Sequence, residues 1–307
     1  MDFVKCKEFI YRNARPLDLA RWKFFFENGT KEEVLECLSF YQNKDGGFGH
    51  ALEADIWNPN SFPIGTWRAT EIIAELGGVS AKHPMIIKIL SYLESKDGFD
   101  SKTEQWTYTI PSNNDYPHAI WWEHKDMPKD FDPNPNASLA GFIVTYADKE
   151  SDLYQFGIKM VKRSFDYMVE HCPIQDEHVI GCYISLYNYL INSQEIMIVD
   201  MEKFKECLLK MVDSSLCLDF EKWGKEYVPM PSTFFSSPDS FLYNGREELA
   251  SRECELIQKQ QLDDGSFLVP WSWWTDYKEY EIAVNWWKSE LIIKKLLFFK
   301  KFSKKSR

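Results

Sequence analysis

Two kinds of helical segment alternate along the chain. In the first kind, apolar residues recur every three or four positions on a charged background, as in Lys31–Gln42 and Pro84–Glu94. This spacing predicts helices with one buried face and one solvated face. Three later segments share the pattern, and they are 153–170, 201–212 and 246–260.

The second kind is apolar on nearly every side. Ala137–Ala147 and Val179–Ile191 contain no charged residue, which predicts helices buried all round. Thr66–Leu76 and Tyr280–Leu297 have the same character with a few charges added. Strand signals are few, and polar helices that alternate with apolar ones predict two concentric layers. We therefore expect an all-α fold, an α/α toroid built as a two-layer barrel of about six helical hairpins.

A short turn motif repeats between these helices. Gln42–Gly49 follows one polar helix, Gln261–Phe267 follows the last, and Lys96–Phe99 follows the helix between them, each with an Asp-Gly turn and an aromatic residue. Helical repeats of about 50 residues would fit roughly six times into the chain. No linker divides it, so residues 1–307 are expected to form a single toroid domain.

Composition and charge argue against several classes of protein. The net charge of −11 argues against nucleic-acid binding, which requires a basic surface. The seven cysteines are scattered singly, as expected for reduced thiols rather than a disulfide framework or a metal site. We expect neither a metal nor a cofactor. The sequence lacks a long apolar run and a signal-peptide pattern, so a cytoplasmic protein is expected.

The C-terminal tail, at about 298–307, is basic. From Lys294 onward the chain carries seven positive charges and no negative ones, interleaved with apolar residues. This composition predicts peripheral contact with an anionic membrane. The alternative is that the last helix buries its apolar residues and places its lysines at the helix C-terminus, where the dipole favours them.

The turn motif also carries a resemblance. The Gln-x-x-Asp-Gly-Gly-Phe-Gly element at Gln42–Gly49 resembles the repeat of squalene-hopene cyclases and protein prenyltransferase β subunits. Asp45–Asp55, Asn60–Pro63, Trp121–Trp122 and Asn134–Ala137 together look like a group of bacterial prenyltransferase-like proteins. The resemblance implies an α/α toroid and isoprenoid chemistry.

The chain departs from these families at their catalytic motifs. Squalene-type cyclases protonate an alkene with an Asp-x-Asp-Asp motif, and this motif does not occur in the sequence. The adjacent pair Asp263 and Asp264 lies in a turn repeat instead. Cys217 and Asp219 have the wrong order for the zinc ligands of protein prenyltransferases. Neither mechanism transfers intact.

The segment His50–Arg68 supplies the candidate acids. It is polar and precedes an apolar helix, which in a two-layer barrel places it at the mouth of the cavity. Glu53 and Asp55 can share a proton there, and burial of one would keep it protonated at neutral pH. We predict that both are catalytic, beside substrate-binding residues within the same segment: His50, Asn58, Asn60 and Arg68. The alternative is that the carboxylates cap turn amides or pair with arginine.

Aromatic clusters supply candidate cavity walls. Trp121 and Trp122 precede His124, and Trp273 and Trp287 belong to a tryptophan-rich C-terminal segment. Aromatic faces stabilise carbocations and also stack on sugar rings. His178, at the start of an apolar helix, completes the predicted binding residues. Ordinary packing is the alternative for the tryptophans, and a hydrogen-bonded histidine at a helix terminus is the alternative for His178.

We therefore expect an isoprenoid-processing enzyme of the terpene cyclase kind, with a small-molecule substrate, a carboxylic-acid proton donor and an aromatic-lined cavity. A carbohydrate-active α/α-barrel lyase or hydrolase is the first alternative, and a non-catalytic lipid- or ligand-binding toroid is the second. An apolar cavity wall would favour isoprenoids, whereas an open groove rich in Asn, Arg and carboxylates would favour sugars.

Overall fold

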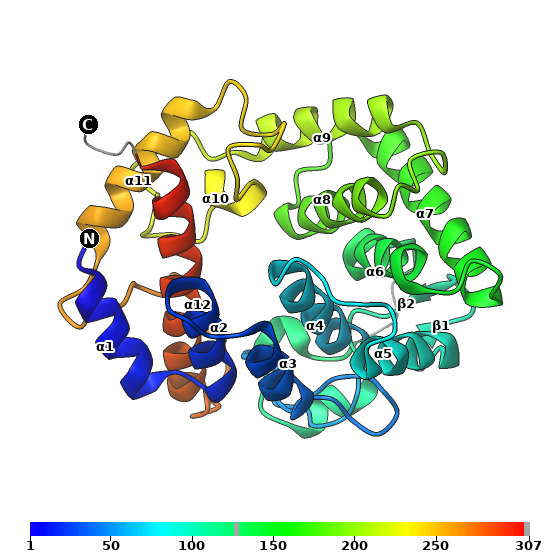
Figure 1. The fold of residues 1–307 in the computed structure, drawn as a ribbon, viewed down its shortest axis with the longest axis horizontal. Coiled ribbons are helices and arrows are strands. Elements are labelled where there is room, and N and C mark those ends of the chain that lie inside the picture. Colours follow the sequence, from blue (N-terminus) through cyan, green and yellow to red (C-terminus); the bar gives the residue numbers. More distant parts are fainter. Residues whose placement is uncertain (126–128, 304–307) are drawn as a thin grey trace. The chain divides into compact units, whose positions relative to one another are not determined.

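Helices dominate the computed structural model, which describes residues 1–125 and 129–303 (Figure 1). Within these residues there are twelve α-helices, two short 3₁₀ helices and one hairpin of two-residue strands. The strands are β1 (Phe99–Asp100) and β2 (Gln105–Trp106), paired antiparallel with Phe99 opposite Trp106. The predicted all-α class is confirmed.

The helices alternate in character. The amphipathic ones are α1 (Phe3–Asn13), α3 (Lys31–Ser39), α5 (Pro84–Ser95), α7 (Asp152–His171), α9 (Met201–Ser215) and α11 (Glu247–Gln260). Between them lie the more evenly apolar α2 (Pro16–Phe26), α4 (Pro63–Glu75), α6 (Pro133–Tyr146), α8 (Glu177–Asn192) and α12 (Tyr280–Phe302), and the four-residue α10 (Pro231–Phe234). The 3₁₀ helices are η1 (Pro111–Asp115) and η2 (Ile120–Trp122). The sequence predicts the alternation for α3–α9, α11 and α12, but it does not single out α1, α2 or α10.

The chain forms two compact units. Unit 1 comprises residues 1–38 and 215–307, and unit 2 comprises residues 39–214.

Local signals explain several helix ends. Thr30 and Glu33 form a capping box at the start of α3, since the Thr30 N–H donates to the Glu33 carboxylate (2.7 Å) and the Glu33 N–H donates to Thr30 Oγ1 (3.2 Å). Pro84 opens α5, and Gly77 and Gly78 with positive φ follow α4. Helix α3 ends at Ser39, a little earlier than predicted.

The two wholly apolar segments differ in burial. Every residue from Ala137 to Val144 in α6 is buried, whereas the last three residues of the predicted segment, 145–147, are half-buried. In α8, however, Gly181 and Ser185 are half-buried and Asn188 is exposed, so this helix is not buried all round. A Cβ on Gly181 would meet no described atom within 4 Å. The uncharged residues of α8 therefore include an open face, which composition alone did not reveal.

The first Gln-Asp-Gly turn contacts α5 within unit 2. The Gln42 amide donates to the carbonyl oxygens of Gly46 (3.0 Å) and Met85 (3.3 Å), the latter in α5. Gly46 has φ +96°, and a Cβ there would clash with the carbonyl oxygen of Lys88. Phe48 is fully buried. The motif thus shapes a tight turn and holds the next polar helix.

The last turn repeats this arrangement against the first helix of the chain, within unit 1. The Gln261 amide donates to the carbonyl oxygens of Gly265 (3.3 Å) and Asp2 (2.9 Å), the residue that caps α1. Gly265 has φ +89° and lies against the backbone of Lys5, while Phe267 is buried. The last turn therefore contacts α1 as the first turn contacts α5.

Helix α12 accounts for most of the basic C-terminal segment. Its apolar residues Ile292, Ile293 and Leu296 are buried, and Phe298 packs on Phe302 with ring centroids 4.4 Å apart. Its lysines at positions 300 and 301 are exposed in the last turn. This placement favours a helix terminus over a membrane anchor, and the membrane contact stays a prediction. Residues 304–307 of the predicted tail lie outside the described residues.

Candidate functional site

Two loop segments of unit 2, 50–61 and 107–124, lie side by side. The N–H of Trp57 donates to the carbonyl of Pro117, and the N–H of Ala119 donates to the carbonyl of Asp55, both at 2.9 Å. An isolated antiparallel bridge joins Ile56 to His118. These bonds bring the predicted acids and the predicted tryptophan pair into one region despite their distance in sequence.

Asparagine side chains fix the paired loops. Asn58 is fully buried, and its Oδ1 accepts from the backbone N–H (3.0 Å) and the amide (3.1 Å) of Asn60. Its Nδ2 donates to Ser112 Oγ (2.9 Å) and Asn113 Oδ1 (3.0 Å), and Asn113 donates to the carbonyl of Trp122 (3.1 Å). The amide oxygen and both amide hydrogens of Asn58 are thus bonded to residues of the paired loops. Asn58 therefore holds the two loops in position.

Both predicted acids are buried. The exposed fractions of Glu53 and Asp55 are 8% and 4%. Burial raises the pKa of Tyr108, and the negative charge of Glu53 raises it further, so this carboxyl lies within electrostatic reach of the phenol. The Tyr108 ring stacks on Trp122, with centroids 4.7 Å apart and planes at 18°. A buried carboxyl therefore lies beside a pair of stacked aromatic rings.

Helix α4 adds an acid that the pattern analysis did not single out. The Glu71 carboxylate accepts hydrogen bonds from Ser185 Oγ of α8 (3.1 Å) and Ser138 Oγ of α6 (3.2 Å). Burial raises its pKa, although the Ser185 hydroxyl and the Arg68 charge one turn earlier oppose the rise. Arg68 itself is buried, with 7% exposed. The sequence signal that could have identified Glu71 is a single carboxylate within a largely apolar helix.

The Glu71 carboxyl lies on an open side of two helices. Trp67 and Glu71 are one turn apart on α4 and are both half-buried, between neighbours that are buried. Gly181 and Ser185 have the same spacing on the open face of α8, and Ser185 contacts Glu71. Helices α4 and α8 thus carry a half-buried tryptophan, a half-buried acid and a half-buried serine at these positions.

Acidic caps begin the neighbouring helices. Asp132 Oδ1 accepts from the Asn134 N–H at α6 (2.9 Å), and Asp176 Oδ1 accepts from the His178 N–H at α8 (2.9 Å). Burial and the charge of Asp176 raise the pKa of Asp132. The His178 ring is exposed, and its Nε2 lies 4.0 Å from the Glu177 carboxylate. His178 therefore stands at the start of α8, near this acidic end.

The remaining predicted residues of unit 2 lie farther out. His50 is exposed, with Nε2 2.9 Å from Asn43 Oδ1, and Asn60 lines an open groove of about 680 Å³. The groove is lined by Asn43, Lys44, Asp45, Asn60, Ser61, Asp97, Ile110 and Ser112. Trp121 is half-buried, and His124 Nδ1 lies 3.0 Å from Thr109 Oγ1.

The other two predicted tryptophans belong to unit 1. Trp273 is fully buried, and its ring centroid lies 5.9 Å from that of Tyr280. Trp287 is half-buried and meets Trp271 edge-on, with centroids 5.1 Å apart. Neither tryptophan belongs to unit 2, and the predicted substrate-binding role of each stays a prediction.

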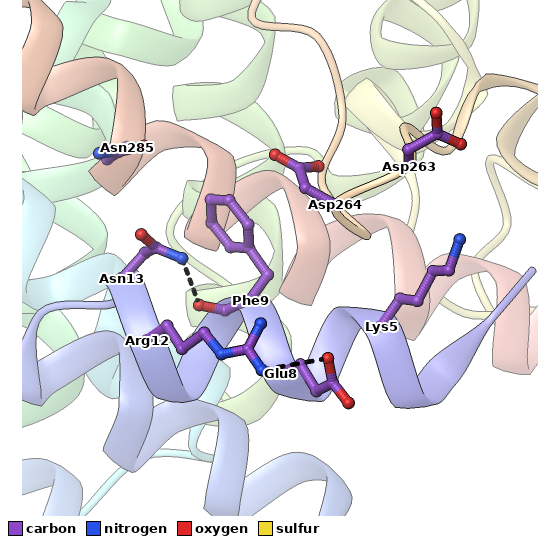
Figure 2. A pocket seen from close by; sticks show the side chains of 8 residues that line it. All are labelled: Lys5, Glu8, Phe9, Arg12, Asn13, Asp263, Asp264 and Asn285. Atoms are coloured by element: carbon purple, nitrogen blue, oxygen red, sulfur yellow. Dashed lines mark hydrogen bonds and ion pairs between the residues drawn. The ribbon is translucent and has the colours of Figure 1, made fainter.

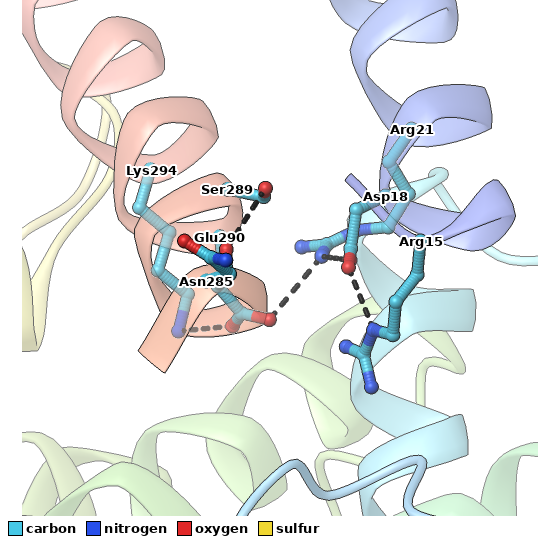
Figure 3. Close-up of polar contacts among 7 residues, drawn as sticks. All are labelled: Arg15, Asp18, Arg21, Asn285, Ser289, Glu290 and Lys294. Atoms are coloured by element: carbon cyan, nitrogen blue, oxygen red, sulfur yellow. Dashed lines mark hydrogen bonds and ion pairs between the residues drawn. The ribbon is translucent and has the colours of Figure 1, made fainter. Parts of the chain in front are cut away.

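Unit 1 has its own polar features. A buried network joins α2 to α12, in which Arg21 contacts Asp18 (3.2 Å) and Glu290 (3.3 Å), and Arg15 contacts Asp18 (2.8 Å) (Figure 3). A pocket of about 310 Å³ lies beside α1 (Figure 2). Its lining residues are Lys5, Glu8, Phe9, Arg12, Asn13, Asp263, Asp264 and Asn285. The paired charges of the network indicate a structural role.

No group of three or more His, Cys, Asp or Glu side chains within 1–125 and 129–303 is arranged to hold a metal ion. No helix in the same ranges is long and apolar enough to cross a membrane. The sequence matches no protein-family model, no curated protein and no solved structure.

Proposed function

We propose that unit 2 carries the acid site of an isoprenoid-processing enzyme of the terpene cyclase kind. The observation that carries the proposal is the juxtaposition of buried and half-buried carboxyls with aromatic rings. Glu53 is buried beside Tyr108, whose ring stacks on Trp122. Glu71, whose pKa is raised by burial, shares one side of α4 with Trp67.

This combination suits protonation of an alkene. A carboxylic acid that keeps its proton at neutral pH can transfer it to a carbon–carbon double bond, leaving a carbocation and a carboxylate. The faces of tryptophan and tyrosine stabilise that cation. The carboxylate can then remove a proton from the cyclised cation, which restores the acid and yields an alkene product. Glu53, Asp55 and Glu71 are the candidate donors.

We also propose that the helical hairpins close into an α/α toroid. Two observations support it. Amphipathic and apolar helices alternate through the described chain. The last Gln-Asp-Gly turn holds α1 in the way the first holds α5, so the repeat continues from the end of the chain into its beginning.

Turnover of polyprenyl substrates by the full chain tests the proposed activity. Squalene, farnesyl diphosphate and geranylgeranyl diphosphate are incubated with the protein, and products are separated by gas chromatography with mass spectrometry. Cyclic products are expected with at least one of them. Loss of the donor's proton should reduce the rate by about 10²–10⁴-fold, so one of Glu53→Gln, Asp55→Asn and Glu71→Gln should show this loss.

Glu123→Gln is the matched control, because Glu123 is an exposed carboxylate that follows Trp122 and pairs with Lys125 at 3.0 Å. It should retain the parent rate. Full activity in both Asp55→Asn and Glu53→Gln would exclude acid catalysis by either residue. Absence of turnover with all three substrates, or full activity in every variant, would overturn the proposal. Co-purified lipid without turnover would instead favour a ligand-binding protein.

One observation favours a carbohydrate-active enzyme as a second candidate. The open groove beside the first Gln-Asp-Gly turn is lined mainly by amide, hydroxyl and carboxylate side chains, which are suited to sugar hydroxyls. Asn60→Ala should then weaken binding of an oligosaccharide in a calorimetric titration. A panel of neutral and acidic oligosaccharides that produces no heat with the parent protein would exclude this candidate.

A further inference from the structure

A second chemically distinctive group lies in unit 1, on α12. The side chain of Lys295 is half-buried and leaves the helix between apolar residues one turn away on either side, Leu291, Ile292, Phe298 and Phe299. Its Nζ lies 5.3 Å from the centroid of the Phe267 ring. The amine forms no hydrogen bond or ion pair with another residue in the described part of the chain.

The nearest opposite charge belongs to α11 and is already engaged. Glu253 is fully buried, with Oε1 accepting from Ser232 Oγ (2.5 Å) and Oε2 from the Ser232 N–H (2.9 Å). Burial lowers the pKa of Lys295 even though the Glu253 charge raises it, and burial raises the pKa of Glu253. An amine in this setting holds its proton weakly.

The preceding residue provides an internal contrast. Lys294 is exposed, and its Nζ lies 2.9 Å from Glu290 Oε1 in an ordinary ion pair. The two lysines share one helix and one sequence neighbourhood, but the Lys294 amine pairs with a carboxylate whereas the Lys295 amine lies over an aromatic ring.

We propose that Lys295 is a nucleophilic amine that captures an apolar aldehyde as a Schiff base. The Nζ lone pair attacks the carbonyl carbon, and the carbonyl oxygen takes a proton to give a carbinolamine. The hydroxyl then leaves as water while the nitrogen loses its second proton, so amine and aldehyde become imine and water without oxidation or reduction. The Phe267 ring and the aliphatic neighbours select an apolar aldehyde over a sugar. The inference does not depend on the acid site of unit 2.

Reductive trapping tests this proposal. The full chain is incubated with hexanal and sodium cyanoborohydride at pH 7, and modified lysines are mapped by peptide mass spectrometry against time. The fraction of free amine rises about tenfold for each unit by which a lysine pKa falls. Lys295 should therefore be alkylated faster than Lys294, and Lys295→Arg should abolish the fast phase while leaving the slower sites unchanged.

Glu253→Gln provides a readout that a structural role would not change. The Gln side chain can still accept a hydrogen bond from Ser232, but the substitution removes the negative charge that raises the pKa of Lys295. The pH at which Lys295 trapping is half-maximal should therefore move downward. Trapping of Lys295 no faster than that of Lys294 in the correctly folded parent protein would overturn the proposal, as would an unchanged or raised midpoint in Glu253→Gln.

Discussion

Replacing Gln261 tests whether the repeated turn stabilises the fold as its contacts indicate. The side chain accepts from the Asp2 N–H (2.6 Å) and donates to the Asp2 carbonyl (2.9 Å), the Gly265 carbonyl (3.3 Å) and Cys6 Sγ (3.1 Å). Gln261→Ala removes all four. Asp2 lies at an exposed position and can bind water instead, and the Gly265 carbonyl keeps the Cys6 thiol as a donor at 3.3 Å.

The expected loss is therefore the net value of two or three hydrogen bonds, about 1–3 kcal/mol. For a chain of 307 residues this corresponds to a fall in melting temperature of about 2–5 °C. Urea unfolding followed by circular dichroism measures the free energy of unfolding, and differential scanning calorimetry measures the temperature.

A matched control is Gln175→Ala, which removes one exposed contact of 3.5 Å and should change stability by less than about 0.5 kcal/mol. Gln261→Glu should be at least as destabilising as Gln261→Ala, because a carboxylate cannot donate to the Asp2 and Gly265 carbonyls. Equal stability of Gln261→Ala and Gln175→Ala would refute the reasoning.

Two further predictions concern single residues. Gly46→Ala should lower the free energy of unfolding in urea by more than about 2 kcal/mol, because positive φ adds about 1 kcal/mol to the clash with Lys88. Gly245→Ala should lower it by only about 1 kcal/mol, because Gly245 has φ +79° and no described atom lies within 4 Å of its Cβ position. Similar losses in the two variants would contradict this prediction. The raised pKa of Glu71 contributes stability that is present below its unfolded value of 4.5 and is lost as pH rises through the folded pKa. Glu71→Gln should therefore gain stability relative to the parent between pH 4 and pH 8, by about 1.4 kcal/mol per unit of elevation, and a difference that does not change with pH would refute it.

Hydrophobic periodicity predicted the helices well because burial imposes it directly. Val34, Leu35 and Leu38 form the buried stripe of α3, and residues 137–144 of the uncharged segment in α6 are buried. The open face of α8 could not be read from the sequence, because Gly and Ser are equally compatible with close packing and with a solvent-facing surface. Only the neighbouring helices decide which applies at Gly181 and Ser185.

The candidate site was predicted in part. The loop motif drew attention to Glu53 and Asp55, and both are buried. Their proximity to Trp122 depends on pairing between two loops, which local sequence does not encode. Glu71 was overlooked because a single carboxylate in an apolar helix does not reveal whether it faces solvent, an arginine or two serines. Its hydrogen bonds come from two other helices.

The central claim, that a carboxyl of unit 2 protonates an alkene, is tested most directly by turnover in deuterium oxide. Carboxyl protons exchange with solvent, so the acid would deliver deuterium to carbon, and the cyclic product should be about one mass unit heavier than product formed in ordinary water. Fragmentation should place the label at the carbon that is protonated first. A cyclic product that contains no carbon-bound deuterium would contradict the account.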